Sequence, residues 1–120
     1  MKIFLTAQDK LRLQSLKSTI DCDYASFDYT LQELCKLFKL SDHKLRYGFE
    51  AMHGTTIIDY QSRKRLSHIT ELLKNEEMSL SQAVYDAGFR EYSTFYRLFK
   101  KEFKMPPKRW RKANLHVVDG

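Results

Sequence analysis

Residues 92–101 carry hydroxyl, guanidinium and ammonium groups at helical spacing, and such groups donate hydrogen bonds to anions and to nucleobase edges. Arg97 offers a planar fork of donors that fits a guanine edge, and Lys100 offers a point charge that fits a phosphate oxygen. Phe95 and Phe99 fall on the opposite face of the same predicted helix. The spacing therefore predicts a helix anchored by aromatic side chains, with an outer face that contacts a polar, anionic partner.

A shorter apolar pattern precedes this helix and predicts another one, from Ser81 to Ala87. Its members are Leu80, Ala83, Val84 and Ala87. Gly88 follows the last of them, as a residue that ends a helix does. A short helix, a tight turn and a second helix with a polar outer face are typical of a helix-turn-helix, whose second helix enters a DNA major groove.

The pattern occurs twice in the chain. The apolar residues of 31–49 recur in 80–99, with an offset of 49 residues in the first helix and 50 in the second. The sequence thus predicts helix-turn-helix units at about 30–54 and 79–103, joined by a connector helix from Thr56 to Lys74. A helix of that length spans about 28 Å at 1.5 Å per residue. Because adjacent major grooves on one face of DNA lie about 34 Å apart, we expect the connector to place two recognition helices about one DNA turn apart.

Helical periodicity dominates the rest of the chain, and four glycines and two prolines leave little room for long loops. We expect an all-α fold of about seven helices, arranged as two helix-turn-helix subdomains of the homeodomain-like kind. The remaining predicted helices are Ala7 to about Ile20 with Thr6 as N-cap, Leu31 to Phe38 with Thr30 as N-cap, just after Ser41 to about Gly54, Tyr92 to Phe103, and Pro107 to Asn114.

Positive charge is concentrated in the second half of the chain. Lys and Arg number eight against eight Asp and Glu from Met1 to Tyr60, but thirteen against seven from Gln61 onward. Such a surface favours a polyanion, and a solvated face that only aids solubility is the alternative. We expect no membrane span and no secretion signal, because no apolar run is long enough. Cys22 and Cys35 lack metal-ligand spacing, so we expect reduced thiols in the cytoplasm, no metal and no cofactor.

A set of residues in both units matches the signature of a known family. In the second unit they are Leu80, Gly88, Phe89, Phe95, Phe99, Lys100, Lys101, Phe103, Pro107 and Trp110, and in the first Leu31, Leu34, Ser41, Leu45, Phe49, Gly54, Tyr60, Arg65, Leu66, Leu72 and Leu73. On these residues, nearly the whole chain resembles the DNA-binding domain of the AraC/XylS family of bacterial transcription regulators. The motif Leu-Arg-x-Gly-Phe at residues 45–49 also resembles the branch of the family that includes siderophore-responsive regulators.

The resemblance implies a domain that stands alone or accompanies a separate effector or dimerisation domain. The apolar, uncapped residues Ile3 and Phe4 favour a piece of a longer regulator. The chain departs from the family at Lys39 and Lys104, where the family usually has Gly, and at Arg90, which replaces a capping Ser; these departures fall on the turns and helix ends. Gly48 lies inside the first recognition helix, where we expect it to allow close approach of either a neighbouring helix or DNA.

The exposed helix faces and the resemblance together predict the contacts. Residues expected at base edges are His43, Lys44, Arg46 and Tyr47 in the first unit and Tyr92, Ser93, Tyr96 and Arg97 in the second. Residues expected at phosphates are Thr30, Ser79, Thr94, Lys100 and Lys101. The alternative for the first-unit residues is an ordinary exposed helix position, and for Tyr92 and Tyr96 it is packing against the turn.

The leading hypothesis is a sequence-specific double-stranded DNA binder that regulates transcription. A helical protein-interaction module, for example one that contacts RNA polymerase, is the alternative, and Lys108, Arg109 and Arg111 fit a DNA backbone, polymerase or plain solubility equally well. An enzyme is not expected, since the four histidines are scattered and no nucleophile elbow, phosphate loop or zinc-binding helix motif occurs.

Overall fold

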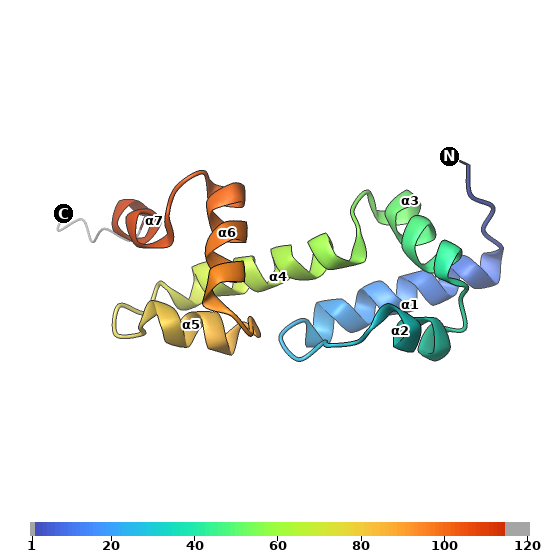
Figure 1. Ribbon diagram of the computed structural model, residues 1–120, viewed down its shortest axis with the longest axis horizontal. Helices are drawn as coiled ribbons and strands as arrows, with labels where there is room; N and C mark the ends of the chain where they lie inside the picture. The colour runs from blue at the N-terminus through green and yellow to red at the C-terminus, as the bar shows by residue number, and fades with distance from the viewer. Residues whose placement is uncertain (1, 115–120) are drawn as a thin grey trace. The chain divides into compact units, whose positions relative to one another are not determined.

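The computed structural model describes residues 2–114, and within that range the chain forms helices and turns without a strand (Figure 1). A π-helical segment, Lys44–Gly48, runs directly into α3. The α-helices are α1 Ala7–Asp23, α2 Leu31–Phe38, α3 Phe49–His53, α4 Ile57–Leu72, α5 Leu80–Asp86, α6 Tyr92–Phe103 and α7 Pro107–Asn114. The expected all-α fold is confirmed, and the bounds of α2, α6 and α7 are those that the sequence predicted.

Local hydrogen bonds account for where most helices begin. The Thr6 hydroxyl accepts from the Asp9 backbone N–H at 3.0 Å, and the Asp9 carboxylate accepts from the Thr6 N–H at 2.9 Å. Thr30 and Glu33 form the same reciprocal capping box ahead of α2. Such a cap contributes about 1 kcal/mol to helix stability. Helix α6 has no such device, because Glu91 stands at its N-cap without a side-chain cap bond.

The connector helix α4 is shorter at both ends than predicted. Thr56 lies outside the helix because its hydroxyl caps it, accepting from the Asp59 N–H at 3.1 Å. At the other end, the N–H groups of Lys74 and Asn75 bond to carbonyls three residues back, so the last turn tightens and α4 ends at Leu72. Helix α5 begins one residue earlier than predicted, because Ser79 caps it through the Gln82 N–H at 3.1 Å.

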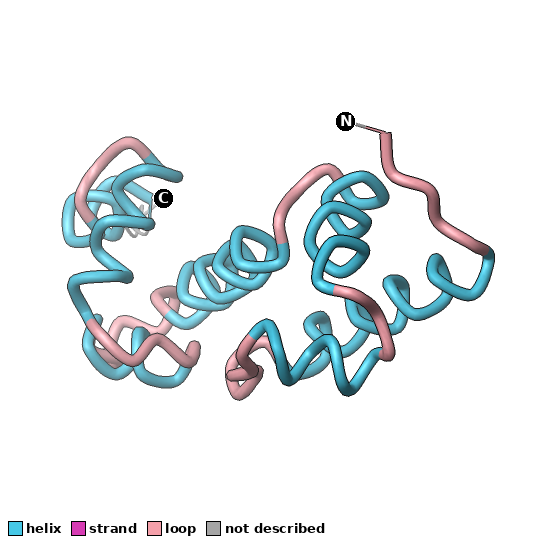
Figure 2. The backbone as a smooth tube through the Cα atoms, turned by 45° about the vertical axis from the view of Figure 1, so that its right-hand side comes forward, coloured by secondary structure: helices cyan, strands magenta, loops and turns pink. Residues whose placement is uncertain are grey.

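The chain divides into two compact units at Gln61 and Ser62, each with its own apolar core. In unit 1 the core joins α1 and α2 to the helix formed by Lys44–Gly48 and α3, which is the predicted first recognition helix, and in unit 2 it joins α4, α5 and α6. Short loops connect the helices within each unit (Figure 2). The fully buried side chains include Leu13, Leu16, Ile20, Leu45 and Phe49 in unit 1 and Ile69, Leu73, Ala83, Ala87, Phe95, Phe99 and Pro107 in unit 2.

Two lysines occupy left-handed backbone conformations that usually favour glycine. Lys39 ends α2 with φ 53° and ψ 48°, and Lys104 ends α6 with φ 62° and ψ 20°. These are the two positions where the family resemblance leads one to expect Gly. The departures therefore leave the helix ends in place but load each of them with strain of about 1–2 kcal/mol.

Gly48 allows the first recognition helix to lie close against α1. A Cβ at this position would stand 2.9 Å from Cδ1 of the fully buried Leu13 and 3.1 Å from Cδ2 of Leu5, which is partly buried against the same core. Gly48 itself is buried. Of the two roles expected for this glycine, close approach of a neighbouring helix is the one the structure shows.

Candidate nucleic-acid interface

Aromatic packing fixes the orientation of α6 in unit 2. Phe95 and Phe99 are fully buried, and the Phe99 ring lies 4.4 Å from the Phe103 ring and 5.8 Å from the Trp110 ring, centroid to centroid. Phe95 and Phe99 thus belong to the core of unit 2, and Phe103 and Trp110 are partly buried and pack against it. Because the helix cannot roll about its axis without breaking this stack, its outer face is held in one orientation.

The outer face of α6 carries exposed hydroxyl groups and cations that form no ion pair within residues 2–114. Ser93, Arg97, Lys100 and Lys101 are exposed, and within residues 2–114 no acidic side chain pairs with the three cations. Tyr96 is 38% exposed. No ion pair within residues 2–114 therefore has to break before these cations meet an anion.

Two predicted DNA-contact residues of α6, Tyr92 and Thr94, are partly buried in the protein. Tyr92 is 42% exposed, and its ring meets Phe95 edge-to-face at 5.3 Å. Partial burial, with a smaller effect from Tyr96, raises the pKa of the Tyr92 hydroxyl, which therefore stays a neutral donor. Thr94 is half-buried.

On the predicted first recognition helix, the candidate contact residues His43, Arg46 and Tyr47 touch one another, whereas the cations of α6 described above are not paired. The His43 and Tyr47 rings lie 5.1 Å apart, and the Arg46 guanidinium lies 5.3 Å from the Tyr47 ring centre. Arg46 Nη2 also donates to Asp42 Oδ2 at 2.7 Å, an ion pair that raises the pKa of Arg46. Both partners of that pair are about half exposed. One nitrogen of the Arg46 guanidinium is therefore already engaged by Asp42.

Lys44 is bound to a different part of unit 1. Its ammonium donates to the Asp9 carboxylate at 2.8 Å, and the Asp9 side chain is only 7% exposed. The hydrogen bond from Lys44, followed by those from Thr6, lowers the pKa of Asp9 to about 2. Lys44 thus ties the recognition helix to the start of α1, and this role was not visible in the sequence because the partners are 35 residues apart.

At Thr30 and Ser79, the predicted phosphate contact would come from backbone N–H groups of the helix that follows, not from the side-chain hydroxyl. Their hydroxyls already accept from the N–H groups of Glu33 and Gln82, each at 3.1 Å. The first N–H groups of α2 and α5 have no helical partner and point out of the helix end. The carboxylate of Glu33 lies beside the Thr30 N–H, so the α2 end carries a negative charge that the α5 end does not share.

Sequence reasoning missed an apolar hollow of about 380 Å³ beside the first recognition helix. Its walls come from segments far apart in the chain, so no local pattern announces it. Ile58, 74% exposed, stands at this hollow. The lining residues are Phe27, Tyr29, Leu31, Leu34, Arg46, Tyr47, Glu50, Thr56, Ile57, Ile58 and Gln61.

Other kinds of site receive no support from the described part of the chain. Residues 2–114 contain no group of three or more His, Cys, Asp or Glu placed to hold a metal ion. Cys22 is exposed and Cys35 half-buried, and both are free thiols. No helix in the same range is long and apolar enough to cross a membrane.

Comparison with known proteins gives a consistent result. A family model described as a helix-turn-helix domain matches residues 34–113. The transcriptional activator RhaR of Salmonella typhimurium is 31% identical over 106 residues, which cover 88% of this chain and 36% of that protein. The chain thus spans about a third of the length of the curated relatives it matches.

Solved structures share the fold. The C-terminal domain of the two-component response regulator yesN from Fusobacterium nucleatum superposes with a TM-score of 0.72 at 26% identity, covering 82% of this chain and 95% of that one. The DNA-binding domain of the transcriptional factor AdpA, solved in complex with a target DNA, gives 0.72 at 17% identity, over 85% and 91% of the two chains. At that identity the second comparison shows the fold alone.

Proposed function

The chain belongs to the AraC-type helix-turn-helix family, and we propose that it binds double-stranded DNA with sequence specificity and regulates transcription. This family is one of transcription regulators, not of enzymes. The observation that carries the proposal is the outer face of α6, where Ser93, Arg97 and Lys100 are exposed over a rigid aromatic stack. Phosphate neutralisation supplies the affinity and base-edge contacts supply the selectivity. Such a regulator acts in the cytoplasm.

The finer proposal is that two recognition helices read adjacent major grooves. The repeat of the same motif in each unit supports it, as does the exposed cluster of His43, Arg46 and Tyr47 on the first helix. The two helices are not equivalent, because Arg97 is unpaired within residues 2–114 whereas Arg46 is held by Asp42. We infer that the second helix dominates base selection and that the first reads more weakly.

Selection of bound duplexes from random DNA tests the proposal. We expect a bipartite site with halves about one helical turn apart. On the selected duplex, Arg97→Ala should weaken binding by about 1–3 kcal/mol and relax the preference at one base position.

Arg97→Lys is the matched control, because it keeps the charge and removes the planar fork. It should retain the salt dependence of binding but lose the base preference. If Arg97→Ala bound a panel of single-base operator variants with unchanged affinities and ranking, the assignment of Arg97 would be wrong.

The alternative is a helical protein-interaction module, with RNA polymerase as one such partner. A groove between α1 and α2 favours it, since Leu11 and Leu37 there are 63% and 58% exposed. A gel-shift assay at low salt, with and without competitor DNA, separates the two functions. If no DNA complex formed in this assay, the proposed DNA-binding function would be wrong and the protein-interaction module would replace it.

A further inference from the structure

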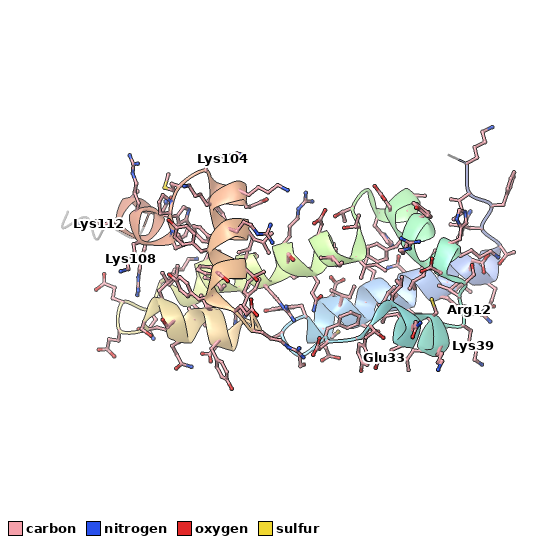
Figure 3. The ribbon with its side chains drawn as sticks, in the orientation of Figure 1. Arg12, Glu33, Lys39, Lys104, Lys108 and Lys112 are labelled. Carbon is pink, nitrogen blue, oxygen red and sulfur yellow. The ribbon has the colours of Figure 1, made fainter. Side chains whose placement is uncertain are left out.

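Helix α7 presents a cationic surface whose direction is fixed by one aromatic anchor. Trp110 packs on Phe103 at 5.6 Å between ring centres. Lys108 and Lys112 stand two residues to either side of Trp110, and at 100° per residue both point away from the core. The side chains of Lys108 and Lys112, labelled in Figure 3, are exposed. Arg109, which follows Lys108 in the chain, is exposed as well.

These side chains border a hollow of about 610 Å³ at the end of unit 2. We call it the α7 hollow; its lining residues are Glu76, Lys108, Arg109, Arg111 and Lys112. Arg111 Nη2 donates to the Asn75 carbonyl at 2.9 Å and so ties α7 to the loop between α4 and α5. That loop leads within four residues to Ser79, the N-cap of α5 and a predicted phosphate contact. The α7 hollow therefore adjoins the loop that leads to the predicted phosphate-binding end of unit 2.

The positive charge of the α7 hollow is not neutralised within the described chain. Lys108, Arg109 and Lys112 form no ion pair with any other residue of 2–114, and Glu76 is the one carboxylate among the lining residues of that range. Lys104, at the end of α6, is likewise exposed and unpaired within that range. Unpaired cations held close together attract a polyanion.

We propose that the α7 hollow binds phosphates of the DNA backbone that flanks the site read by α6. This inference rests on the proposed function. DNA is favoured over an acidic protein because, among residues 97–114, no large apolar side chain is exposed, whereas protein interfaces centre on such residues. The cations also continue from the reading helix itself, through Lys100, Lys101 and Lys104 into α7.

The test measures how affinity depends on salt for two duplexes selected by the protein. One duplex ends at the edge of the selected site, and the other extends ten base pairs beyond it on the α6 side. The variant is Lys108→Gln with Lys112→Gln. The control is Lys2→Gln with Lys10→Gln, which removes the same charge from exposed positions of unit 1.

On the extended duplex, the variant should lower the slope of log K against log salt by about 1.8, or 0.9 for each lost phosphate contact. Doubling the salt concentration should then weaken the parent about 3.5-fold more than the variant. On the short duplex the variant and the parent should share one slope, and the control pair should leave both slopes unchanged. Glu76→Gln should raise affinity for the extended duplex, because it removes the carboxylate that opposes phosphate.

The inference is overturned if the variant slope equals the parent slope on the extended duplex, or if it falls equally on both duplexes. An acidic protein would then be the partner to test. Failure of the parent to bind any duplex at low salt would instead refute the proposed function. Circular dichroism of the variant confirms that α7 remains helical.

Discussion

Replacing Lys39 by glycine should stabilise unit 1, although it removes a side chain. Lys39 has φ 53° and ψ 48°, close to the ideal left-handed conformation, which costs an L-residue roughly 1–2 kcal/mol. Glycine adopts it freely but gains about 0.5–1 kcal/mol of extra freedom in the unfolded chain. The net expectation for Lys39→Gly is a gain of about 0.5–1 kcal/mol in the free energy of unfolding.

The contacts of Lys39 support a gain, not a loss, in the free energy of unfolding on substitution by glycine. The backbone N–H groups of Lys39 and Leu40 both bond to the Cys35 carbonyl, and Arg12 donates to the Lys39 carbonyl at 3.0 Å. All of these bonds use the backbone and survive the substitution. The Lys39 side chain is exposed and forms no ion pair within residues 2–114, so its removal loses little.

Urea unfolding followed by circular dichroism measures the effect, as a higher midpoint with an unchanged m-value. Lys39→Ala is the control, because it removes the side chain but keeps the Cβ that makes the conformation costly. Alanine should leave the midpoint nearly unchanged. If alanine stabilised as much as glycine, or if neither did, the backbone explanation would be refuted. Lys104→Gly should act in the same direction on unit 2.

Three further perturbations test the interior of unit 1. Gly48→Ala should lower stability by up to about 2 kcal/mol, because an overpacking cost of about 1–3 kcal/mol against Leu13 exceeds the gain of about 1 kcal/mol in helix propensity; a higher urea midpoint would contradict this. His53 has a buried Nε2 without a hydrogen-bond partner within residues 2–114, and burial, reinforced by Lys17, lowers its pKa below 6.5. Since the unfolded chain then binds the proton more readily, stability should be full above about pH 6.5 and fall below it, and His53→Gln should flatten urea midpoints between pH 8 and pH 5.5. The pKa of Asp9 is lowered to about 2, so its pairing with Lys44 should stabilise the fold above about pH 4 and be lost between pH 4 and pH 2. Asp9→Asn should remove that acid dependence in a urea or thermal titration, and a variant with the same acid profile as the parent would argue against the pair.

Much of the fold was predictable because it is encoded over short distances in the chain. A capping box joins residues three apart, and helical periodicity repeats every three to four residues. Thr30 and Glu33 therefore set the start of α2, and the aromatic spacing of α6 set which face would be buried. The duplication of the pattern predicted two similar motifs, and each unit of the structure contains one.

The tertiary structure decided what the locally predicted parts do. Whether Gly48 faces DNA or a helix depended on α1 crossing beside it. Lys44 looked like one more exposed cation until folding brought it to Asp9, 35 residues away in the chain. The apolar hollow of unit 1 and the α7 hollow of unit 2 likewise arise from segments separated in sequence. Hydrogen bonds and periodicity within a few residues are fixed by chain connectivity, whereas packing and ion pairs across tens of residues exist only once the core has closed.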